Sequence, residues 1–327
     1  MKRVFVSRAI FKEAADILQK EVDVEVWPSE NPPPVEVFIE KASQVDGLIT
    51  MLTDPITKAV IETGKANHLK VISQMAVGYD NIDLAAATAS GIPVGHTPGV
   101  LTETTADFAW SLLMAAARRV VESHNEVQRG VWRPWGPDVL CGVDIYGATL
   151  GLIGFGRIGQ AMAQRASGFK MRVLYTQRHR DLEAETKYQA EFVPMTKLLA
   201  ESDFVSLHAY LSAETKGMMG ASQFNQMKPS AIFINTARGA MVDHLALLQA
   251  LQTGQIAAAA LDVFDPEPIP VEHPLLKLHN VIITPHIGSA STKTRQRMAL
   301  MTVENILAGL SGARLPYCAN PQVFKKS

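Results

Sequence analysis

The sequence has very little cysteine: its 327 residues include only Cys141 and Cys318. Two cysteines so far apart provide neither a disulfide framework nor the close spacing of a structural zinc site. We therefore expect reduced thiols in a cytoplasmic protein, and we predict no metal site.

Long hydrophobic runs are also missing. The longest apolar segment, residues 108–117, is interrupted by Ser111 and is far shorter than the roughly 20 residues that a membrane helix needs. Near the N-terminus, Glu13 and Asp16 come too early for the apolar core of a signal peptide. These features predict neither a membrane span nor a secretion signal.

Charge of one sign is not in excess. The 31 Lys and Arg residues nearly balance 32 Asp and Glu residues, for a formal net charge of −1. This balance gives no indication of a nucleic acid or a membrane surface as partner. Apolar residues make up 47% of the chain, which is typical of globular proteins. Because single cores seldom grow beyond about 250–300 residues, the length predicts two domains.

In the first hundred residues, short apolar segments of strand type alternate with amphipathic helical segments. Strands are expected at 3–6, 22–27, 47–50, 69–75 and 92–95, and helices at 9–20, 35–42, 55–65 and 83–90. Such alternation predicts a parallel sheet with helices on both faces. This part contains no glycine-rich fingerprint, so we do not expect it to hold a cofactor.

A helical pattern then runs from residue 102 to 129, and an irregular arm with Trp132 and Trp135 follows over residues 130–146. Tryptophans on such an arm suggest a protein–protein contact or a pocket lid. They can equally pack on the chain's own surface, and the sequence leaves both readings open. Further strands are expected at 149–153, 173–176, 204–208, 231–236, 258–263 and 281–284, and a last helix at 292–310.

The most informative motif is Gly-x-Gly-x-x-Gly, formed by Gly154, Gly156 and Gly159. It follows an apolar strand and precedes a run of good helix formers, which is the context that gives the motif meaning. Gly154 permits a tight turn, Gly156 leaves room for a pyrophosphate, and Gly159 lets the helix and strand pack closely. The motif therefore predicts a dinucleotide held at a helix N-terminus.

The choice of dinucleotide depends on the tip of the next strand, about 20 residues past the motif. Thr176 and Gln177 occupy that tip, and the first acid is Asp181. An NAD site favours an acid there for the ribose hydroxyls, whereas Arg178 and Arg180 can grip a 2′-phosphate. A solvated basic loop is the alternative. We predict a preference for NADPH, with NADH possible as cofactor.

Arg238, Glu267 and His286 each follow a different predicted strand, and ligands of open α/β sheets bind at the C-terminal ends of strands. Reduction of a 2-keto acid by hydride needs a fixed cation for the substrate, which Arg provides. It also needs a proton donor, for which imidazole is suited, and a carboxylate that orients the imidazole. Singly, each residue fits a surface or structural role better. Their joint placement predicts a catalytic set.

The motifs together resemble the D-isomer-specific 2-hydroxyacid dehydrogenases over nearly the whole chain. The segments that carry the resemblance are 77–83, 154–159, 235–239, 265–268 and 285–290. Within that family, the segments 174–178 and 135–142 are most similar to glyoxylate/hydroxypyruvate reductases, including bacterial ones that also reduce 2-ketogluconate. One departure is Tyr210, where the family often has proline.

The resemblance implies a fold of two doubly wound parallel-sheet domains with the active site in the cleft. A flavodoxin-like substrate domain would comprise residues 1–99 and 288–327, and a Rossmann cofactor domain residues 100–287. It implies a homodimer in which Trp135 reaches the partner's active site. Arg238, Glu267 and His286 would be catalytic, and the substrate would also meet Val77, Gly78 and Trp135.

The implied cofactor contacts lie in the cofactor domain, except Gly288, which is the first residue of the second segment of the substrate domain. They are Thr104, Gly154, Phe155, Gly156, Arg157, Ile158, Gly159, Thr176, Arg178, Arg180, His208, Ala209, Thr236, Ala237, Arg238, Asp262, His286 and Gly288. The expected reaction is reduction of glyoxylate or hydroxypyruvate. A 2-ketogluconate or broader 2-keto acid reductase is the nearest alternative, and a dinucleotide-sensing corepressor or binding module is the alternative from another class.

Overall fold

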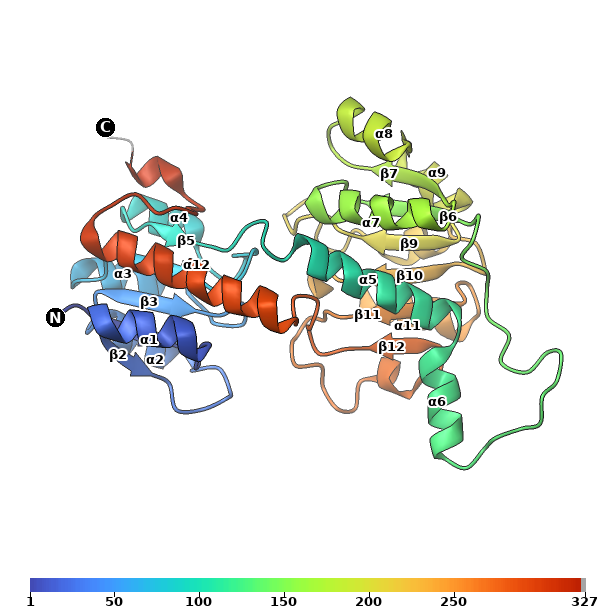
Figure 1. The fold of residues 1–327 in the computed structure, drawn as a ribbon, viewed down its shortest axis with the longest axis horizontal. Coiled ribbons are helices and arrows are strands. Elements are labelled where there is room, and N and C mark those ends of the chain that lie inside the picture. The colour runs from blue at the N-terminus through green and yellow to red at the C-terminus, as the bar shows by residue number, and fades with distance from the viewer. Residues whose placement is uncertain (325–327) are drawn as a thin grey trace. The chain divides into compact units, whose positions relative to one another are not determined.

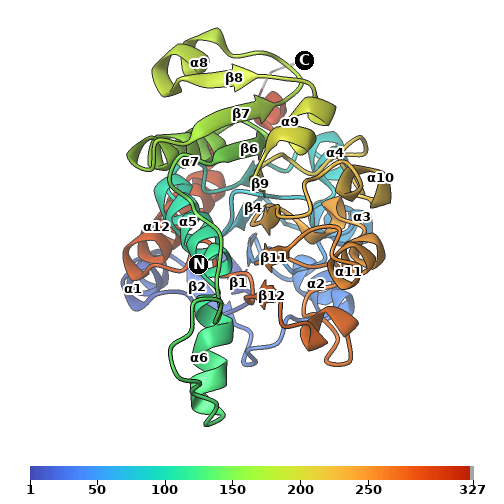
Figure 2. The same ribbon diagram turned by 90° about the vertical axis from the view of Figure 1, so that its right-hand side faces the viewer.

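The computed structural model describes residues 1–324, in which the chain forms two compact units. The first unit comprises Met1–Leu101 and Ala290–Ser327, and the second comprises Thr102–Ser289. Figures 1 and 2 show a parallel sheet in each unit, with helices on both of its faces. The predicted fold class is confirmed.

The sheet of the first unit has the strand order β2-β1-β3-β4-β5, and its pairs are parallel. This is the flavodoxin-like order of doubly wound sheets. The strands are β1 (Arg3–Val6), β2 (Asp23–Val26), β3 (Gly47–Thr50), β4 (Val71–Gln74) and β5 (Val94–Gly95). Strands β3 and β4 are buried along their whole length, as expected for central strands that are covered on both faces.

Helices bury apolar side chains against both faces of this sheet. They are α1 (Lys12–Glu21), α2 (Val35–Ala42), α3 (Lys58–Ala66), α4 (Leu84–Ala89) and α12 (Thr292–Ser311), with a 3₁₀ turn η3 (Pro321–Phe324). Helix α12 belongs to this unit because its buried face packs on β3 and β4. The chain thus returns to the first unit after completing the second.

The sheet of the second unit has the order β12-β11-β10-β9-β6-β7-β8, again parallel. From the glycine-motif strand outward, this is the Rossmann order with one strand added. The strands are β6 (Thr149–Ile153), β7 (Arg172–Thr176), β8 (Ala190–Phe192), β9 (Phe204–Leu207), β10 (Ile232–Asn235), β11 (Ala258–Leu261) and β12 (Val281–Ile283). The sequence patterns missed β8, a short strand at the edge of the sheet.

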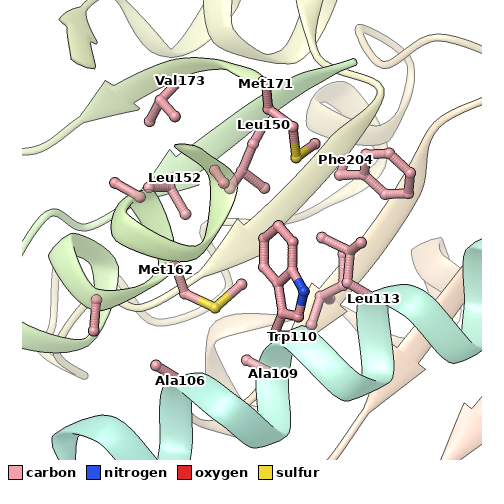
Figure 3. Close-up of a cluster of buried hydrophobic side chains, with 14 of the residues drawn as sticks. Ala106, Ala109, Trp110, Leu113, Leu150, Leu152, Met162, Met171, Val173 and Phe204 are labelled. Atoms are coloured by element: carbon pink, nitrogen blue, oxygen red, sulfur yellow. The ribbon is translucent and has the colours of Figure 1, made fainter. Parts of the chain in front are cut away.

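The helices of the second unit cover both faces of its sheet. They are α5 (Thr102–Ala117), α6 (Val120–Gln128), α7 (Arg157–Gly168), α8 (Leu182–Tyr188), α9 (Met195–Glu201), α10 (Ala221–Phe224) and α11 (His244–Gln252), with 3₁₀ turns η1 (Gly239–Met241) and η2 (Pro274–Lys277). Figure 3 shows Trp110 of α5 in one buried apolar cluster with Met162 of α7 and Leu150 of β6. This apolar layer holds the glycine-motif strand and helix in place.

The prediction of one continuous helix over residues 102–129 is wrong. Helix α5 ends at Ala117, and α6 starts after Arg119, whose φ is 51°. The break arises because the Ala117 carbonyl accepts a hydrogen bond from Val143 N at 2.9 Å. In a continuous helix, that carbonyl would accept a hydrogen bond from the backbone N–H four residues further along. Gly142 makes this contact possible, since a Cβ there would overlap the same carbonyl oxygen.

Candidate active site

The glycine motif forms a turn between β6 and α7, and each of its three positions lacks a side chain for a different physical reason. Gly154 has φ +94°, and a Cβ there would lie 2.6 Å from Ala209 N. A Cβ at Gly159 would overlap the Gly154 carbonyl oxygen. Gly156 differs: among residues 1–324, apart from its chain neighbours, no atom lies within 4 Å of where its Cβ would be. The turn is tight inside and open where a ligand's phosphates would approach.

Helix α7 starts directly at this open position, with Gly156 as its N-cap residue. The backbone N–H groups of a first helical turn have no partner within the helix and attract anions. Phe155, Arg157 and Ile158 flank this helix start in the chain. A pyrophosphate needs backbone N–H groups and space that is free of side chains, and this helix start provides both. The site therefore fits the pyrophosphate of a dinucleotide, which is the ligand that the motif predicts.

The tip of β7 lies against the glycine turn. Gly154 N donates to the carbonyl of Thr176 at 2.9 Å, and Phe155 N donates to Gln177 Oε1 at 3.1 Å. Arg180 donates from Nε and Nη2 to the carboxylate of Glu185 at 2.7 and 2.8 Å. Arg178 is largely exposed and reaches Glu214 only at 4.0 Å. At this tip, the charge of Arg180 is therefore compensated by a close carboxylate, whereas the Glu214 carboxylate is distant from Arg178.

The structure brings Glu267 and His286 together. His286 Nδ1 and Glu267 Oε2 are 2.7 Å apart, and each side chain is about four-fifths buried, with 23% and 22% exposed. The other carboxylate oxygen of Glu267 accepts a hydrogen bond from Phe264 N at 2.9 Å. One oxygen thus fixes the carboxylate to the backbone while the other binds the imidazole. His286 Nε2 is left as the nitrogen that can serve a substrate.

The backbone of His286 has φ +53°, a region that non-glycine residues seldom occupy. Two carbonyls hold it there: His286 N donates to Asp262 O at 2.9 Å and to Thr284 O at 3.1 Å. Strained backbone of this kind persists where its surroundings over-determine it, and it is common at active sites. The imidazole is therefore placed by the fold before any ligand binds.

Asp262 organises this turn, and sequence reasoning missed that role by treating it only as a cofactor contact. Its Oδ1 accepts from Thr284 Oγ1 at 2.6 Å and from Ile287 N at 2.9 Å. Its Oδ2 accepts from Gly288 N at 2.7 Å. Burial raises the pKa of the Asp262 carboxyl, while the hydrogen bonds from Thr284, Ile287 and Gly288 oppose that rise. A polar residue directly after β11 was the only signal in the sequence.

Arg238 follows β10, at the same C-terminal edge of the sheet that carries Glu267 and His286. Its Nη1 donates to Ala237 O at 2.7 Å. The buried Asn235 side chain shapes this loop: its Oδ1 accepts from Ala237 N at 2.9 Å and its Nδ2 donates to Arg238 O at 3.0 Å. Asn235 is the first residue of the segment 235–239 that carries the family resemblance, but the sequence pattern indicated no role for it.

Other predicted cofactor contacts lie along the same edge. His208 follows β9, and its Nε2 is 2.8 Å from Ser206 Oγ. Burial lowers the pKa of His208 to about 4, so its imidazole is neutral at pH 7. Thr236 Oγ1 is buried and, within residues 1–324, has no hydrogen-bond partner. Thr104 lies in the first turn of α5. These positions are consistent with a ligand along the strand ends.

The remaining predicted contacts are outside this edge. Val77 and Gly78 follow β4 in the first unit, where their carbonyls accept from His96 Nδ1 at 3.1 Å and from Gln74 Nε2 at 3.3 Å. Trp135 is 90% exposed on the arm, so it does not pack on the described surface of its own chain.

Neither a metal centre nor a membrane span is found in the part of the chain that the structure describes. No group of three or more His, Cys, Asp or Glu residues among residues 1–324 is arranged to hold a metal ion. None of the described helices combines the length and the apolar character needed to cross a bilayer.

The fold and the glycine turn define a dinucleotide-binding protein, and comparison with known proteins identifies its family. The family model for the NAD binding domain of D-isomer specific 2-hydroxyacid dehydrogenases matches residues 110–288. The glyoxylate reductase of Korarchaeum cryptofilum is 50% identical over 99% of this chain and 97% of its own length. The chain therefore belongs to the D-isomer specific 2-hydroxyacid dehydrogenase family and is an oxidoreductase.

Solved structures agree with this assignment. A protein of Thermus thermophilus superposes with a TM-score of 0.90 at 45% identity, covering 97% of this chain and 99% of that one. An NADPH-dependent glyoxylate/hydroxypyruvate reductase of Sinorhizobium meliloti, solved with NADP and malonate, superposes with a TM-score of 0.86 at 28% identity. The match covers 100% of this chain and 99% of that one.

Proposed function

We propose that this protein reduces glyoxylate or hydroxypyruvate to the corresponding 2-hydroxy acid, with NADPH as the preferred reductant. The observation that carries the proposal is the 2.7 Å contact between His286 Nδ1 and Glu267 Oε2. It lies at the strand ends of a dinucleotide-binding unit, on the edge that also bears Arg238. Relatives and structural neighbours named glyoxylate reductase support the choice of substrate.

When bound, a nicotinamide dinucleotide would supply the hydride that reduces the carbonyl carbon next to the substrate carboxylate. Arg238 binds the substrate carboxylate and polarises the adjacent carbonyl, because a guanidinium is planar and permanently charged. His286 Nε2 donates the proton that neutralises the developing alkoxide. Glu267 orients the imidazole through Nδ1 and stabilises its charged form, as carboxylates do for catalytic histidines. The proton converts the alkoxide oxygen into the hydroxyl group of the 2-hydroxy acid, while the hydride forms the new bond to carbon.

The preference for NADPH is supported by the tip of β7. Thr176 and Gln177 stand where an NAD site favours an acid, and Gln177 Oε1 is occupied by Phe155 N at 3.1 Å. Arg178 is 74% exposed beside this tip and can turn towards a 2′-phosphate. NADH remains a usable cofactor in this proposal because every other contact is independent of the phosphate.

The first experiment is to measure initial rates of NADPH oxidation with glyoxylate, hydroxypyruvate and 2-ketogluconate, and to repeat them with NADH. We expect rapid NADPH-linked turnover of the two small acids. Turnover mainly of 2-ketogluconate would replace the proposed substrate while keeping the mechanism. Tight binding of NADPH without turnover of any acid would contradict the enzymatic proposal and favour a dinucleotide-sensing role.

We further propose that the protein is a homodimer through α6 and the arm that follows it. Figure 1 shows this helix and arm projecting from the second unit. Within the described chain, none of the residues of α6 is buried, and Val127 and Val131 are 47% and 48% exposed. On the arm that follows, Trp132 and Trp135 are 80% and 90% exposed. An exposed apolar patch of this kind marks an interaction site.

The dimer is tested by sedimentation velocity. The wild-type chain is expected to sediment as a dimer, and the double variant Val127→Glu/Val131→Glu as a monomer, because two carboxylates in an apolar interface lose their hydration without gaining a partner. Leu245→Glu is the matched control, since Leu245 is also exposed but lies on α11. A double variant that stays dimeric would place the interface elsewhere.

A further inference from the structure

The loop after β7 is where the adenosine ribose of a bound dinucleotide must lie. Dinucleotide folds place the ribose at the tip of the strand that follows the glycine motif. Here the Gly154 N–H and the Phe155 N–H are hydrogen-bonded to Thr176 and Gln177 at that tip. The 2′-phosphate that distinguishes NADP from NAD therefore meets the residues directly after the tip. This step rests on the proposed function.

Within that loop, Arg180 is already engaged by an acid. Its Nε and Nη2 donate to the two carboxylate oxygens of Glu185 at 2.7 and 2.8 Å. This is the bidentate geometry with which guanidinium groups also bind phosphate. A 2′-phosphate and Glu185 thus compete for the same fork of donors.

Glu185 is held too firmly to turn away easily. Its side chain is only 12% exposed, and Tyr175 Oη donates to its Oε1 at 2.7 Å. Tyr175 is fully buried, stacks on Phe155 with ring centroids 4.2 Å apart, and accepts from Asp181 N at 3.0 Å. The hydrogen bonds from Arg180 and Tyr175 lower the pKa of Glu185 to about 2. The carboxylate is therefore charged throughout the neutral range.

We propose that Glu185 is a specificity-determining residue for the cofactor, which limits the preference for NADPH over NADH by neutralising Arg180. With Arg180 compensated, Arg178 is the arginine of this loop that can respond to a 2′-phosphate, since its contact with Glu214 is a weak one of 4.0 Å. This competition does not affect NADH, which has no phosphate at this position.

The test is the variant Glu185→Gln, which removes the charge but keeps an oxygen for the Tyr175 hydroxyl. Dissociation constants for NADP⁺ and NAD⁺ are measured by isothermal titration calorimetry, so the readout does not depend on turnover. We expect roughly tenfold tighter binding of NADP⁺, the size of one partly screened charge interaction, and unchanged binding of NAD⁺. Unchanged NAD⁺ affinity also reports an intact fold.

Two comparisons isolate the cause. Glu183→Gln is the matched control, because Glu183 is on the same helix, α8, while the acid that pairs with Arg180 is Glu185; it is expected to leave both affinities unchanged. In an Arg180→Gln background, Glu185→Gln is expected to give no gain for NADP⁺. A gain that persists there would overturn the proposal, since the charge would then act without Arg180.

The proposal is also overturned if Glu185→Gln leaves the affinity for NADP⁺ unchanged or weakens it. The same holds if neither the wild-type protein nor Glu185→Gln binds NADP⁺ measurably. Failure of the proposed reaction looks different. In that case glyoxylate and hydroxypyruvate would not be reduced, while the calorimetric ratio of NADP⁺ to NAD⁺ affinity would still respond to Glu185.

Discussion

The variant His286→Asn is expected to lower kcat for glyoxylate by about 10²–10⁴-fold, the range over which a positioned proton donor contributes to catalysis. The dissociation constant for NADP⁺ should change little. Asparagine is the appropriate replacement because position 286 has φ +53°, and asparagine tolerates this region better than most residues. The measurement is single-turnover kinetics together with calorimetric titration of the cofactor.

We expect so large a loss because asparagine can keep the backbone contacts of position 286 but cannot replace the imidazole that they place. Glu267 holds Nδ1 at 2.7 Å, and the backbone N–H of His286 is held by Asp262 O and Thr284 O. Asparagine is shorter and does not transfer a proton in the neutral range. The backbone can remain in place while the chemistry is lost, which separates catalysis from folding.

Glu267→Gln provides the companion measurement. Its single amide oxygen can accept from Phe264 N or face His286 Nδ1, but it cannot do both as the carboxylate does. We expect a loss of kcat smaller than that of His286→Asn, with cofactor binding retained.

If His286→Asn keeps more than about a tenth of wild-type kcat, His286 is not the proton donor and the mechanism fails.

The sequence could predict the fold and the meeting of Glu267 with His286 because both depend on regular patterns. Strand–helix alternation implies parallel sheets, and parallel strands bring their C-terminal ends to one edge. Glu267 and His286 are 19 residues apart in the sequence, yet each follows its own strand. Their meeting was therefore foreseeable from the topology, although the 2.7 Å distance was not.

Features set by single long-range contacts could not be predicted in this way. The break after Ala117 depends on Val143 N reaching back to its carbonyl, and residues 102–129 contain no glycine or proline to announce it. The loop after β7 is a second case. Its sequence shows two arginines, but only the structure shows that Arg180 is paired with Glu185 on the next helix.

Gly239 is a third case, because its importance comes from a neighbour far along the chain. It directly follows Arg238 and is buried against Phe264, so closely that a Cβ at position 239 would overlap the Phe264 carbonyl group. Phe264 N is the group that binds Glu267 Oε1. One close approach of two backbones thus sets the spacing between the arginine loop and the loop that carries the acid.

Gly239→Ala is therefore expected to lower both stability and activity strongly. Overpacking a filled site costs typically about 1–3 kcal/mol, and here the obstacle is backbone, which has no alternative rotamer. A cost of about 3 kcal/mol corresponds to a fall of roughly 6–12 °C in the midpoint of thermal unfolding. Because Phe264 must move, Glu267 moves with it, and we expect kcat with glyoxylate to fall by at least about tenfold.

Gly168→Ala is the matched control for this prediction. Gly168 is the last residue of α7, and among the described residues outside its own helix and chain neighbours no atom lies within 4 Å of its Cβ position. Alanine there should be neutral or stabilise by up to about 1 kcal/mol, since glycine is the poorer helix former. If Gly239→Ala behaves like Gly168→Ala in unfolding midpoint and kcat, the contact with Phe264 does not set the geometry of the site.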